Sequence, residues 1–285
     1  MNTVPYLFCD AVAGTIAEIE DISWQLTAAN NPQFNSWKRS LKHHTSKRPI
    51  LHLDISFTRG DWSYSIYKSW KSISFTELKQ LKTKYLQVRD VSFYLYALDH
   101  HSSNRQEIED IIRFIAPFMN LATVCLNNDE IPEVYFSVLL SYFRNVHFFR
   151  ISVRHYRKCY EMFLKRHLQS NHIKVLNICG RRWSTEVGDQ IKTLVLSRSL
   201  KEVNCLNTNL VFDKTFFEKL FKIRLYRNGV TFCAICSFEL KEFRKVIRKR
   251  FGGKLIWSRE DGVKVTADKL WQERTWKITM SAAVN

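Results

Sequence analysis

The sequence predicts an α/β protein: a leucine-rich-repeat-like solenoid of strands and helices, preceded by a small helical unit and ended by a short antiparallel β cap. Two observations predict this fold. The pattern apolar-x-x-apolar-x-apolar recurs through residues 120–206 with starts 27, 25 and 27 residues apart, within the range of about 20–29 residues typical of leucine-rich repeats. The segments between the copies have helical periodicity. An ordinary doubly wound α/β sheet with evenly spaced strands remains the alternative.

Each repeat is expected to contain one strand and one helix with a single apolar stripe. The strand positions are Leu121, Val124 and Leu126; Phe148, Ile151 and Val153; Ile173, Leu176 and Ile178; and Leu200, Val203 and Cys205. The helix positions are Tyr135, Val138, Leu139 and Tyr142; Tyr160, Phe163, Leu164 and Leu168; and Val187, Ile191, Leu194 and Val195. A lone unit cannot cover its own apolar faces, whereas stacked units bury a continuous core.

Residues 1–48 are expected to form a small helical unit. Its first helix spans residues 4–19, because Pro5 is favoured in the first helical turn and apolar residues follow at helical spacing. A second short helix around Trp37 leads into a basic cluster over residues 38–48. We place the domain boundary here, so that residues 49–285 form the repeat region.

The repeat region is expected to begin with a strand and a hairpin. Residues 50–55 repeat the strand pattern, and a turn at 59–61 leads into alternating apolar residues over 62–66. These early copies are more widely spaced than the regular ones. Terminal units of repeat proteins are usually atypical in this way.

Two helices are expected between this hairpin and the regular repeats. The first spans residues 75–85 and is followed by another copy of the strand pattern over 88–93. The second spans residues 104–118, because Ser103 and Gln106 have the spacing of a capping box.

The C-terminal part is expected to continue the repeat and then to close the sheet. A helix is predicted around 216–221, and a seventh copy of the pattern at Val230, Cys233 and Ile235. A helix with a basic outer face follows over 240–250. Antiparallel strands are expected at 255–257, 263–265 and 276–278, where they would cap an open sheet edge.

Composition favours an intracellular protein with an acidic partner. The chain has 285 residues, of which 45% are hydrophobic, so it can build a sizeable core. It has no apolar run of about 18 residues and no basic leader before its first apolar segment, so we expect a cytoplasmic or nuclear protein. Its 7 scattered cysteines are an odd number and are expected to be reduced. The formal charge of +17 favours nucleic acid, anionic lipid or an acidic protein as partner.

The candidate binding site is the concave face of the predicted solenoid. Residues that alternate with the buried strand positions point to this face. We expect the partner-binding residues to be Asp54, Ser92, Tyr94, Asn127, Ser152, Arg154, Asn177 and Asn204, with Ser56, Cys125, Cys179 and Leu206 beside them. Such small polar groups can hydrogen-bond a partner along the face. A face that is merely solvated is the alternative.

No enzymatic, metal or cofactor site is predicted. Asp99-His100-His101 is similar to a phosphoesterase motif, but no further metal-binding carboxylates accompany it, so a loop before a helix is the better interpretation. Cys233-x-x-Cys236 has no second ligand pair and is interpreted as structural. Arg59-Gly60-Asp61 is interpreted as a hairpin turn. Without an acid–base pair or a nucleophile motif, we expect a protein that is not an enzyme.

Basic stretches support a second hypothesis, a nucleic-acid or anionic-surface binder. They span residues 38–48 and 241–254, with tryptophans nearby that could stack on bases. One rim of the solenoid is expected to be basic as well, through Arg154, Arg157, Arg181 and Arg182. A solvated helix face is the commoner explanation for such stretches.

Three segments resemble the nematode-expanded family of F-box and F-box-associated proteins. They are Val4-Pro5-Tyr6-Leu7-Phe8-Cys9-Asp10-Ala11-Val12; Leu51-His52-Leu53-Asp54-Ile55-Ser56-Phe57 with Gly60-Asp61-Trp62-Ser63-Tyr64; and residues 209–220, Asn-Leu-Val-Phe-Asp-Lys-Thr-Phe-Phe-Glu-Lys-Leu. The resemblance runs over nearly the whole chain.

The resemblance implies a substrate-receptor subunit of a cullin-type (SCF) ubiquitin ligase. The N-terminal F-box would dock on a Skp1-type adaptor, and the repeat region would hold an unknown protein target. The docking positions would be Pro5, Phe8, Val12, Ile16 and Trp37. Residues 22–33 are polar where a typical F-box has a denser Leu/Ile pattern, so the implied F-box is degenerate.

Overall fold

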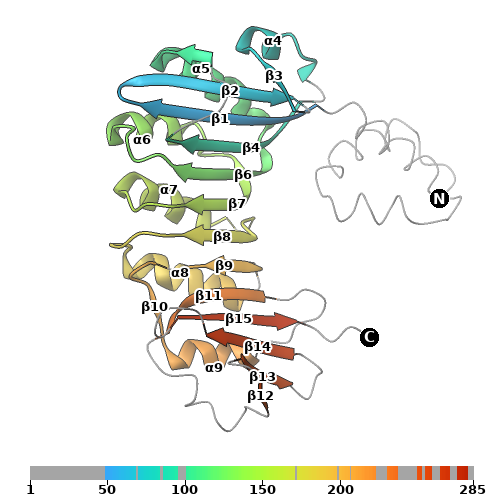
Figure 1. Cartoon of the computed structure of the whole chain (residues 1–285), viewed down its shortest axis with the longest axis vertical. Coiled ribbons are helices and arrows are strands. Elements are labelled where there is room, and N and C mark those ends of the chain that lie inside the picture. The colour runs from blue at the N-terminus through green and yellow to red at the C-terminus, as the bar shows by residue number, and fades with distance from the viewer. Residues whose placement is uncertain are drawn as a thin grey trace, which may run out of the picture.

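The computed structural model has a mixed α/β fold, and its central feature is one open, mostly parallel sheet (Figure 1). It describes residues 49–68, 70–83, 86–95, 101–170, 172–197, 199–205, 207–222, 230–236, 249–251, 254–258, 264–269 and 275–281. The predicted helical unit over 1–48 lies outside these residues. So do all five predicted adaptor-docking positions: Pro5, Phe8, Val12, Ile16 and Trp37.

The strands of the parallel part follow one another in chain order across the sheet. These strands are β1 (Ile50–Thr58), β4 (Gln87–Tyr94), β6 (Asn120–Asn127), β7 (His147–Val153), β8 (Val175–Ile178), β9 (Glu202–Asn204) and β11 (Val230–Cys236), with β10 (Val211–Phe212) beside β11. Because each crossover connects immediate neighbours, its helix packs over the strands that it joins.

Antiparallel strands flank the parallel part at both ends. At the β1 end they are β2 (Asp61–Lys68), β3 (Lys71–Ile73) and β5 (His101–Ser103). At the other end β15 (Thr275–Ser281) pairs with β11, followed by β14 (Lys264–Lys269), β13 (Lys254–Ser258) and β12 (Lys249–Phe251). The predicted hairpin and the predicted antiparallel strands are therefore confirmed.

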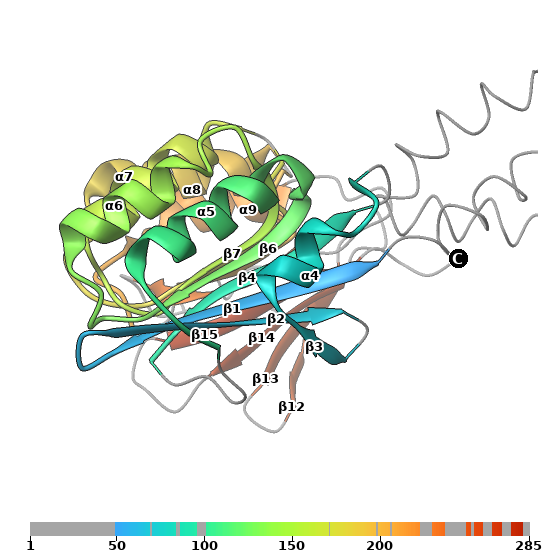
Figure 2. The same ribbon diagram turned by 90° about the horizontal axis from the view of Figure 1, so that it is seen from above.

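The helices lie on one face of the sheet, as Figure 2 shows for α5 to α9. They are α4 (Phe75–Lys79), α5 (Arg105–Ile115), α6 (Glu133–Ser141), α7 (Lys158–Leu168), α8 (Thr185–Leu196) and α9 (Lys214–Lys222), with the 3₁₀ turn η3 (Ala116–Phe118) after α5. Phe75 of α4 packs edge-on against Phe114 of α5 at 6.0 Å between ring centroids. The core lies between this helix layer and the sheet. Within the described residues, no helix is long and apolar enough to cross a membrane.

The predicted strand positions of the four regular copies form this core, with one exception. The strand positions of the second, third and fourth regular copies are buried, and so are the predicted helix positions that follow the second and third. In the first copy, Val124 and Leu126 are buried but Leu121 is only half-buried, and Ala122 takes its place. The pairing of β6 with β7 is irregular at this point, and Leu121 has a positive φ of 54°. A bulge shifts the alternation of side chains by one residue.

The predicted apolar face of α6 is wrong by one residue. We expected Tyr135, Val138, Leu139 and Tyr142 to face the core, but the buried positions are Phe136, Leu139, Leu140 and Phe143. Both sets have spacing i, i+3, i+4, i+7, so periodicity alone cannot separate them. Packing decides which set is buried. Phenylalanine is favoured in the core over tyrosine, because its ring has no hydroxyl that needs a hydrogen-bond partner.

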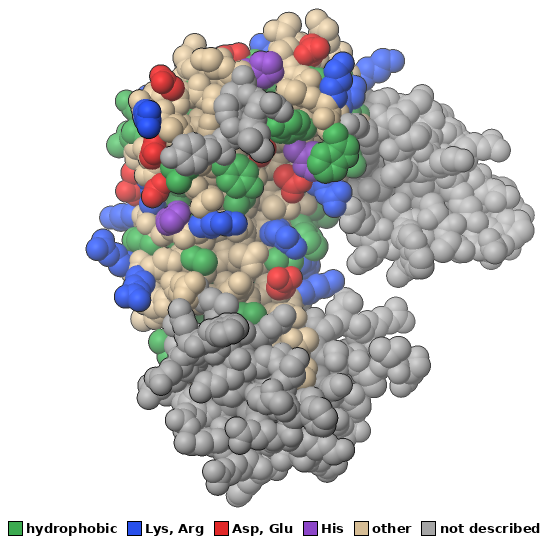
Figure 3. Space-filling model, in the orientation of Figure 1, with side chains coloured by type: hydrophobic (Ala, Val, Ile, Leu, Met, Phe, Trp, Pro, Cys, Tyr) green, Lys and Arg blue, Asp and Glu red, His purple; other side chains and the backbone are tan. Residues whose placement is uncertain are grey.

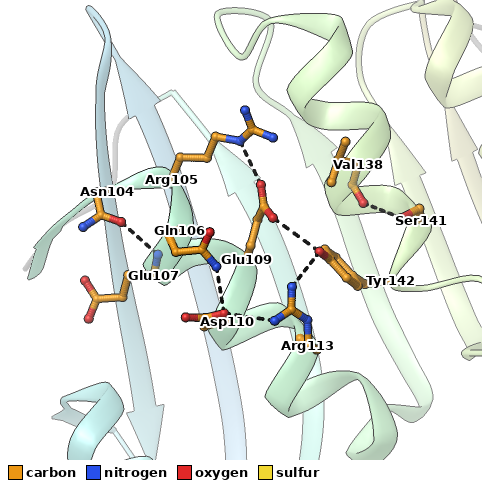
Figure 4. Close-up of polar contacts among 10 residues, drawn as sticks. All are labelled: Asn104, Arg105, Gln106, Glu107, Glu109, Asp110, Arg113, Val138, Ser141 and Tyr142. Atoms are coloured by element: carbon orange, nitrogen blue, oxygen red, sulfur yellow. Dashed lines mark hydrogen bonds and ion pairs between the residues drawn. The ribbon is translucent and has the colours of Figure 1, made fainter.

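The hydroxyl of Tyr142 joins a polar network on the outside of α5 and α6 (Figure 4). It accepts a hydrogen bond from Nη2 of Arg113 at 3.0 Å and donates to Oε2 of Glu109 at 3.3 Å. Nε of Arg105 donates to the other oxygen of Glu109 at 2.8 Å. This network links the two helices at their surface while the apolar residues pack beneath it.

Several predicted helix boundaries need correction. The N-cap of α5 is Asn104, one residue after the predicted Ser103, and its side chain accepts from the backbone N–H of Glu107 at 2.9 Å. The α-helix ends at Ile115, before the 3₁₀ turn. Helix α4 ends at Lys79 rather than at residue 85.

The last predicted repeat has a different register. Phe232 pairs with Val203, and Cys233 pairs with Asn204. Phe232 therefore occupies the inward position that we assigned to Cys233. The end of the predicted helix over 240–250 is also wrong, because Lys249–Phe251 form β12; residues 237–248 lie outside the described part.

Asn128, which follows β6, ties neighbouring units together at the carboxyl ends of their strands. Its buried amide donates to the carbonyls of Phe57 at 3.2 Å and Tyr94 at 2.6 Å. The backbone carbonyl of Asn128 accepts a hydrogen bond from the hydroxyl of Tyr160 at 2.9 Å. One side chain and its backbone thus contact the ends of β1 and β4 and the helix α7.

We expect the change Phe136→Ala to lower the free energy of unfolding by about 3–5 kcal/mol, because it leaves a cavity in the core. Phe136 is fully buried and packs edge-on against Phe93 at 4.8 Å and Tyr160 at 5.0 Å. The control Tyr135→Ala should cost about 1 kcal/mol or less, since this ring is 37% exposed. Urea denaturation of both variants checks this. An equal loss in the two would contradict the position of α6.

We expect His167 to make stability depend on pH. Its ring is 3% exposed and packs against Phe148 and Phe163, and within the described residues its Nε2 has no hydrogen-bond partner. Burial, with smaller effects of Arg166 and His147, lowers its pKa to about 4.

The unfolded chain binds this proton near the ordinary histidine pKa of about 6.5, so the stability is complete above that pH and falls as pH drops toward 4. From about pH 7.5 to about pH 5 the wild type should lose about 2 kcal/mol through this group. Urea denaturation at both values checks this. The same loss in the His167→Phe variant would exclude His167 as the cause.

Candidate protein-binding face

The sheet face opposite the helices is the candidate site, and we call it the open face. Residues alternate along each strand, so those between the buried positions point to it. Strand pairing aligns six of them in one row, which we call the polar row. In order across the sheet they are Asp54, Ser92, Cys125, Ser152, Asn177 and Asn204.

The other predicted binding residues lie in the next row of the same face. Tyr94 pairs with Ser56 on one side and with Asn127 on the other. Arg154 follows the end of β7, and its backbone N–H donates to the carbonyl of Leu126 at 3.1 Å. The register therefore brings together all eight predicted residues: Asp54, Ser92, Tyr94, Asn127, Ser152, Arg154, Asn177 and Asn204.

Most of the polar row is half-buried, which leaves hydrogen-bonding groups within reach of a partner. Ser92 is buried, the other members are half-buried, and Arg154 beside the row is exposed. Burial raises the pKa of the thiol of Cys125 in the row and of Cys179 beside it, against the opposing effect of Arg154. Neutral thiols are poor nucleophiles. The row therefore offers hydrogen bonds rather than covalent chemistry.

A third row of the open face carries charges that the sequence analysis missed. His52 pairs with Asp90, which pairs with Thr123, which in turn pairs with Arg150. Nδ1 of His52 lies 2.7 Å from Oδ2 of Asp90. Extending the alternation by two residues toward the start of each strand would have found these positions.

Charge is distributed unevenly over the open face. Asp54 and Asp90 lie at the β1 end, and burial raises the pKa of Asp54, with a smaller increase from Asp90 and an opposing effect of His52. Arg150 and Arg154 are exposed further along, on and after β7. Figure 3, which views this face, shows Lys and Arg side chains across the middle of the molecule. A partner would thus meet acidic and basic regions in a fixed order.

The predicted basic rim is only partly present. The guanidinium of Arg157 donates to the backbone carbonyls of Ile131 and Asp129, so it holds a loop instead of facing a partner. Arg154, Arg181 and Arg182 are exposed.

The remaining motifs behave as follows. In the motif Asp99-His100-His101 only His101 lies within the described residues, and it begins β5 rather than continuing a loop. Arg59 and Gly60 form the predicted hairpin turn with positive φ angles of 56° and 96°. Cys233 is buried in the sheet. Within the described part of the chain, no group of three or more His, Cys, Asp or Glu side chains could hold a metal ion.

Two of the hollows in the described part of the chain lie on the helix side. The larger, about 500 Å³, lies between α7 and α8, and the smaller, about 130 Å³, lies between α6 and α7. The larger is lined by Leu168, Gln169, Thr185, Glu186, Asp189, Gln190, Thr193 and Leu194. Lys192 lies 3.1 Å from Asp189, and Lys165 lies 2.6 Å from Glu186, so both lining carboxylates are already paired with lysines. These hollows bring together no acid–base pair aimed at a common point.

Comparison of the chain with models of known protein families and with curated proteins finds no match.

Proposed function

We propose that this chain is a protein–protein recognition module that binds its target on the open face. The observation that carries the proposal is the polar row, six side chains held in register by parallel pairing. Short side chains such as Ser92, Ser152 and Asn177 have few rotamers to lose, so hydrogen bonds to them cost little entropy. The charges around the row add specificity and faster association.

We also propose that the strand–helix units form a leucine-rich-repeat-like solenoid. The chain order of the parallel strands and the helices on one face support this. In such an architecture each unit contributes one position to a long binding surface. A target segment would then cross several strands and contact the polar row along its length.

The attachment of this module to a ubiquitin ligase is a further part of the proposal. It rests on the resemblance of the N-terminal segment to an F-box and not on the described residues. The adaptor would be of the Skp1 type, and apolar docking by Phe8, Val12 and their neighbours would provide the affinity. The open face would then present its target for ubiquitylation.

A nucleic-acid or anionic-surface binder is the second candidate, favoured by the net charge of +17 and by the exposed Arg150 and Arg154. Asp54 and Asp90 on the same face oppose it, because they repel phosphates. Salt separates the two functions. Binding to phosphates weakens steeply as salt rises, whereas hydrogen-bonded and apolar protein contacts respond weakly.

We expect a photoreactive residue at position 152 to crosslink a protein in cells, because Ser152 lies in the centre of the polar row. The matched control is position 137, since Ser137 is exposed on the helix side of the molecule. Immunoprecipitation and mass spectrometry identify the product. Crosslinks to nucleic acid from position 152, or equal protein crosslinks from both positions, would argue against protein recognition by this face.

We expect the purified full chain to bind a recombinant Skp1-type adaptor in a pull-down. The double change Phe8→Asp, Val12→Asp should abolish this binding, because two charges would have to be buried in an apolar interface. A Ser152→Asp variant should bind the adaptor as the wild type does. A folded wild-type chain that binds no adaptor would remove the ligase part and leave the recognition module.

A further inference from the structure

Trp70 is exposed to an unusual degree for a residue of its size. It lies at the turn between β2 and β3, and 94% of its surface is accessible. Lys68 pairs with Lys71, so two residues connect the strands. Tight hairpin turns of this length favour Asn or Gly, because their backbone needs positive φ angles. Trp70 has a φ of 70°, in the region that bulky residues rarely occupy.

The fold alone does not explain a tryptophan at this position. The side chain buries little of its surface, so it adds little to the core, while its backbone conformation is unfavourable. Strained residues of this kind concentrate at functional sites. Tryptophan is also one of the residue types enriched among the energetically dominant contacts of protein interfaces.

Trp70 lies beside the acidic end of the open face. Its ring stacks on His52 at 6.3 Å between centroids, with an angle of 20° between the planes. Nδ1 of His52 lies 2.7 Å from Oδ2 of Asp90, and Asp54 lies two residues after His52 on the same face. An indole surface and two carboxylates are thus grouped around one imidazole.

Two further observations characterise this group. Among the described residues, the side chain of His52 contacts Asp90, and Asp54 has no ion pair. Burial also raises the pKa of Asp54, which means that its charged form is costly in the free protein. A cation from a partner would relieve that cost. Lys68 and Lys71 flank the turn, so the cation must approach from the side of the carboxylates.

We propose that Trp70, Asp54 and Asp90 form an anchoring site for an arginine of the protein partner. The inference rests on the proposed function and specifies the partner's chemistry. A guanidinium can stack on the face of an indole, and it can fork onto carboxylate oxygens. An arginine fits this arrangement better than a nucleotide, because the carboxylates repel phosphate.

The test uses the full chain and two synthetic peptides that differ in charge, one with arginines and one with glutamates in a glycine–serine background. The probe is the indole N–H signal of Trp70 in an NMR titration, identified among the 8 tryptophans as the signal missing from the Trp70→Gly variant. We expect a saturable shift with the arginine peptide and none with the glutamate peptide. Asp54→Asn should weaken this affinity by about fivefold or more.

The variant Trp70→Gly separates a binding role from a structural one. Glycine accepts a positive φ without strain, so this variant should unfold at an equal or higher denaturant concentration than the wild type. It should still lose binding of the arginine peptide, measured by fluorescence anisotropy of the labelled peptide. Val134→Ala is the matched control, because Val134 is 74% exposed on α6.

Three results would overturn the inference: no saturable shift with the arginine peptide, an equal shift with the glutamate peptide, or unchanged peptide affinity in Trp70→Gly. Protein crosslinks from position 152 report on the open face independently of Trp70. If those crosslinks form and the arginine peptide does not bind, only the anchoring site fails. If neither occurs, the proposed function fails with it.

Discussion

The structure depends on one row of apolar side chains that crosses the parallel sheet beneath the helices. Leu53, Val91, Val124, Ile151, Leu176, Val203 and Phe232 are aligned by strand pairing, and each is buried. Shifting any strand by one residue would turn its apolar side chains to water, so this row fixes the register of the sheet. The alignment of the polar row, whose members each follow one of these buried residues in its strand, is a consequence of this register. The same constraint that buries the core also aligns the candidate binding residues on the opposite face.

Much of the fold was predictable because apolar spacing reports burial directly. The buried strand positions of the second, third and fourth regular copies of the pattern were placed correctly, and with them the alternate positions that put Ser152, Asn177 and Asn204 on one face. The errors occur where a second physical factor competes with periodicity. At Leu121 a bulge shifts the side chains by one residue. On α6, two apolar stripes have equal spacing, and the polar network of Tyr142 on the surface of α5 and α6 selects between them.

The candidate site was predicted in part for the same reason. Alternation placed the polar row, but the prediction covered only the positions between and after the buried ones, so His52, Asp90 and Arg150, which precede them, were missed. Trp70 could not have been found from periodicity. Its importance comes from a positive φ angle and from exposure, and neither can be read from the spacing of residues. Arg157 shows the converse, since a cation that looks available in the sequence is bound to backbone carbonyls.

The hydrogen bonds of Asn128 affect how cooperatively the strand–helix units open. Its side-chain amide donates to carbonyls near the ends of β1 and β4, and its backbone carbonyl accepts from the hydroxyl of Tyr160 of α7, so one buried residue contacts three elements. Nearest-neighbour contacts alone would let such units open one after another from an end. Because the buried amide of Asn128 is shared, opening one unit would leave unpaired polar groups in the next unit. This part of the sheet should therefore exchange its amide hydrogens as a single cooperative block.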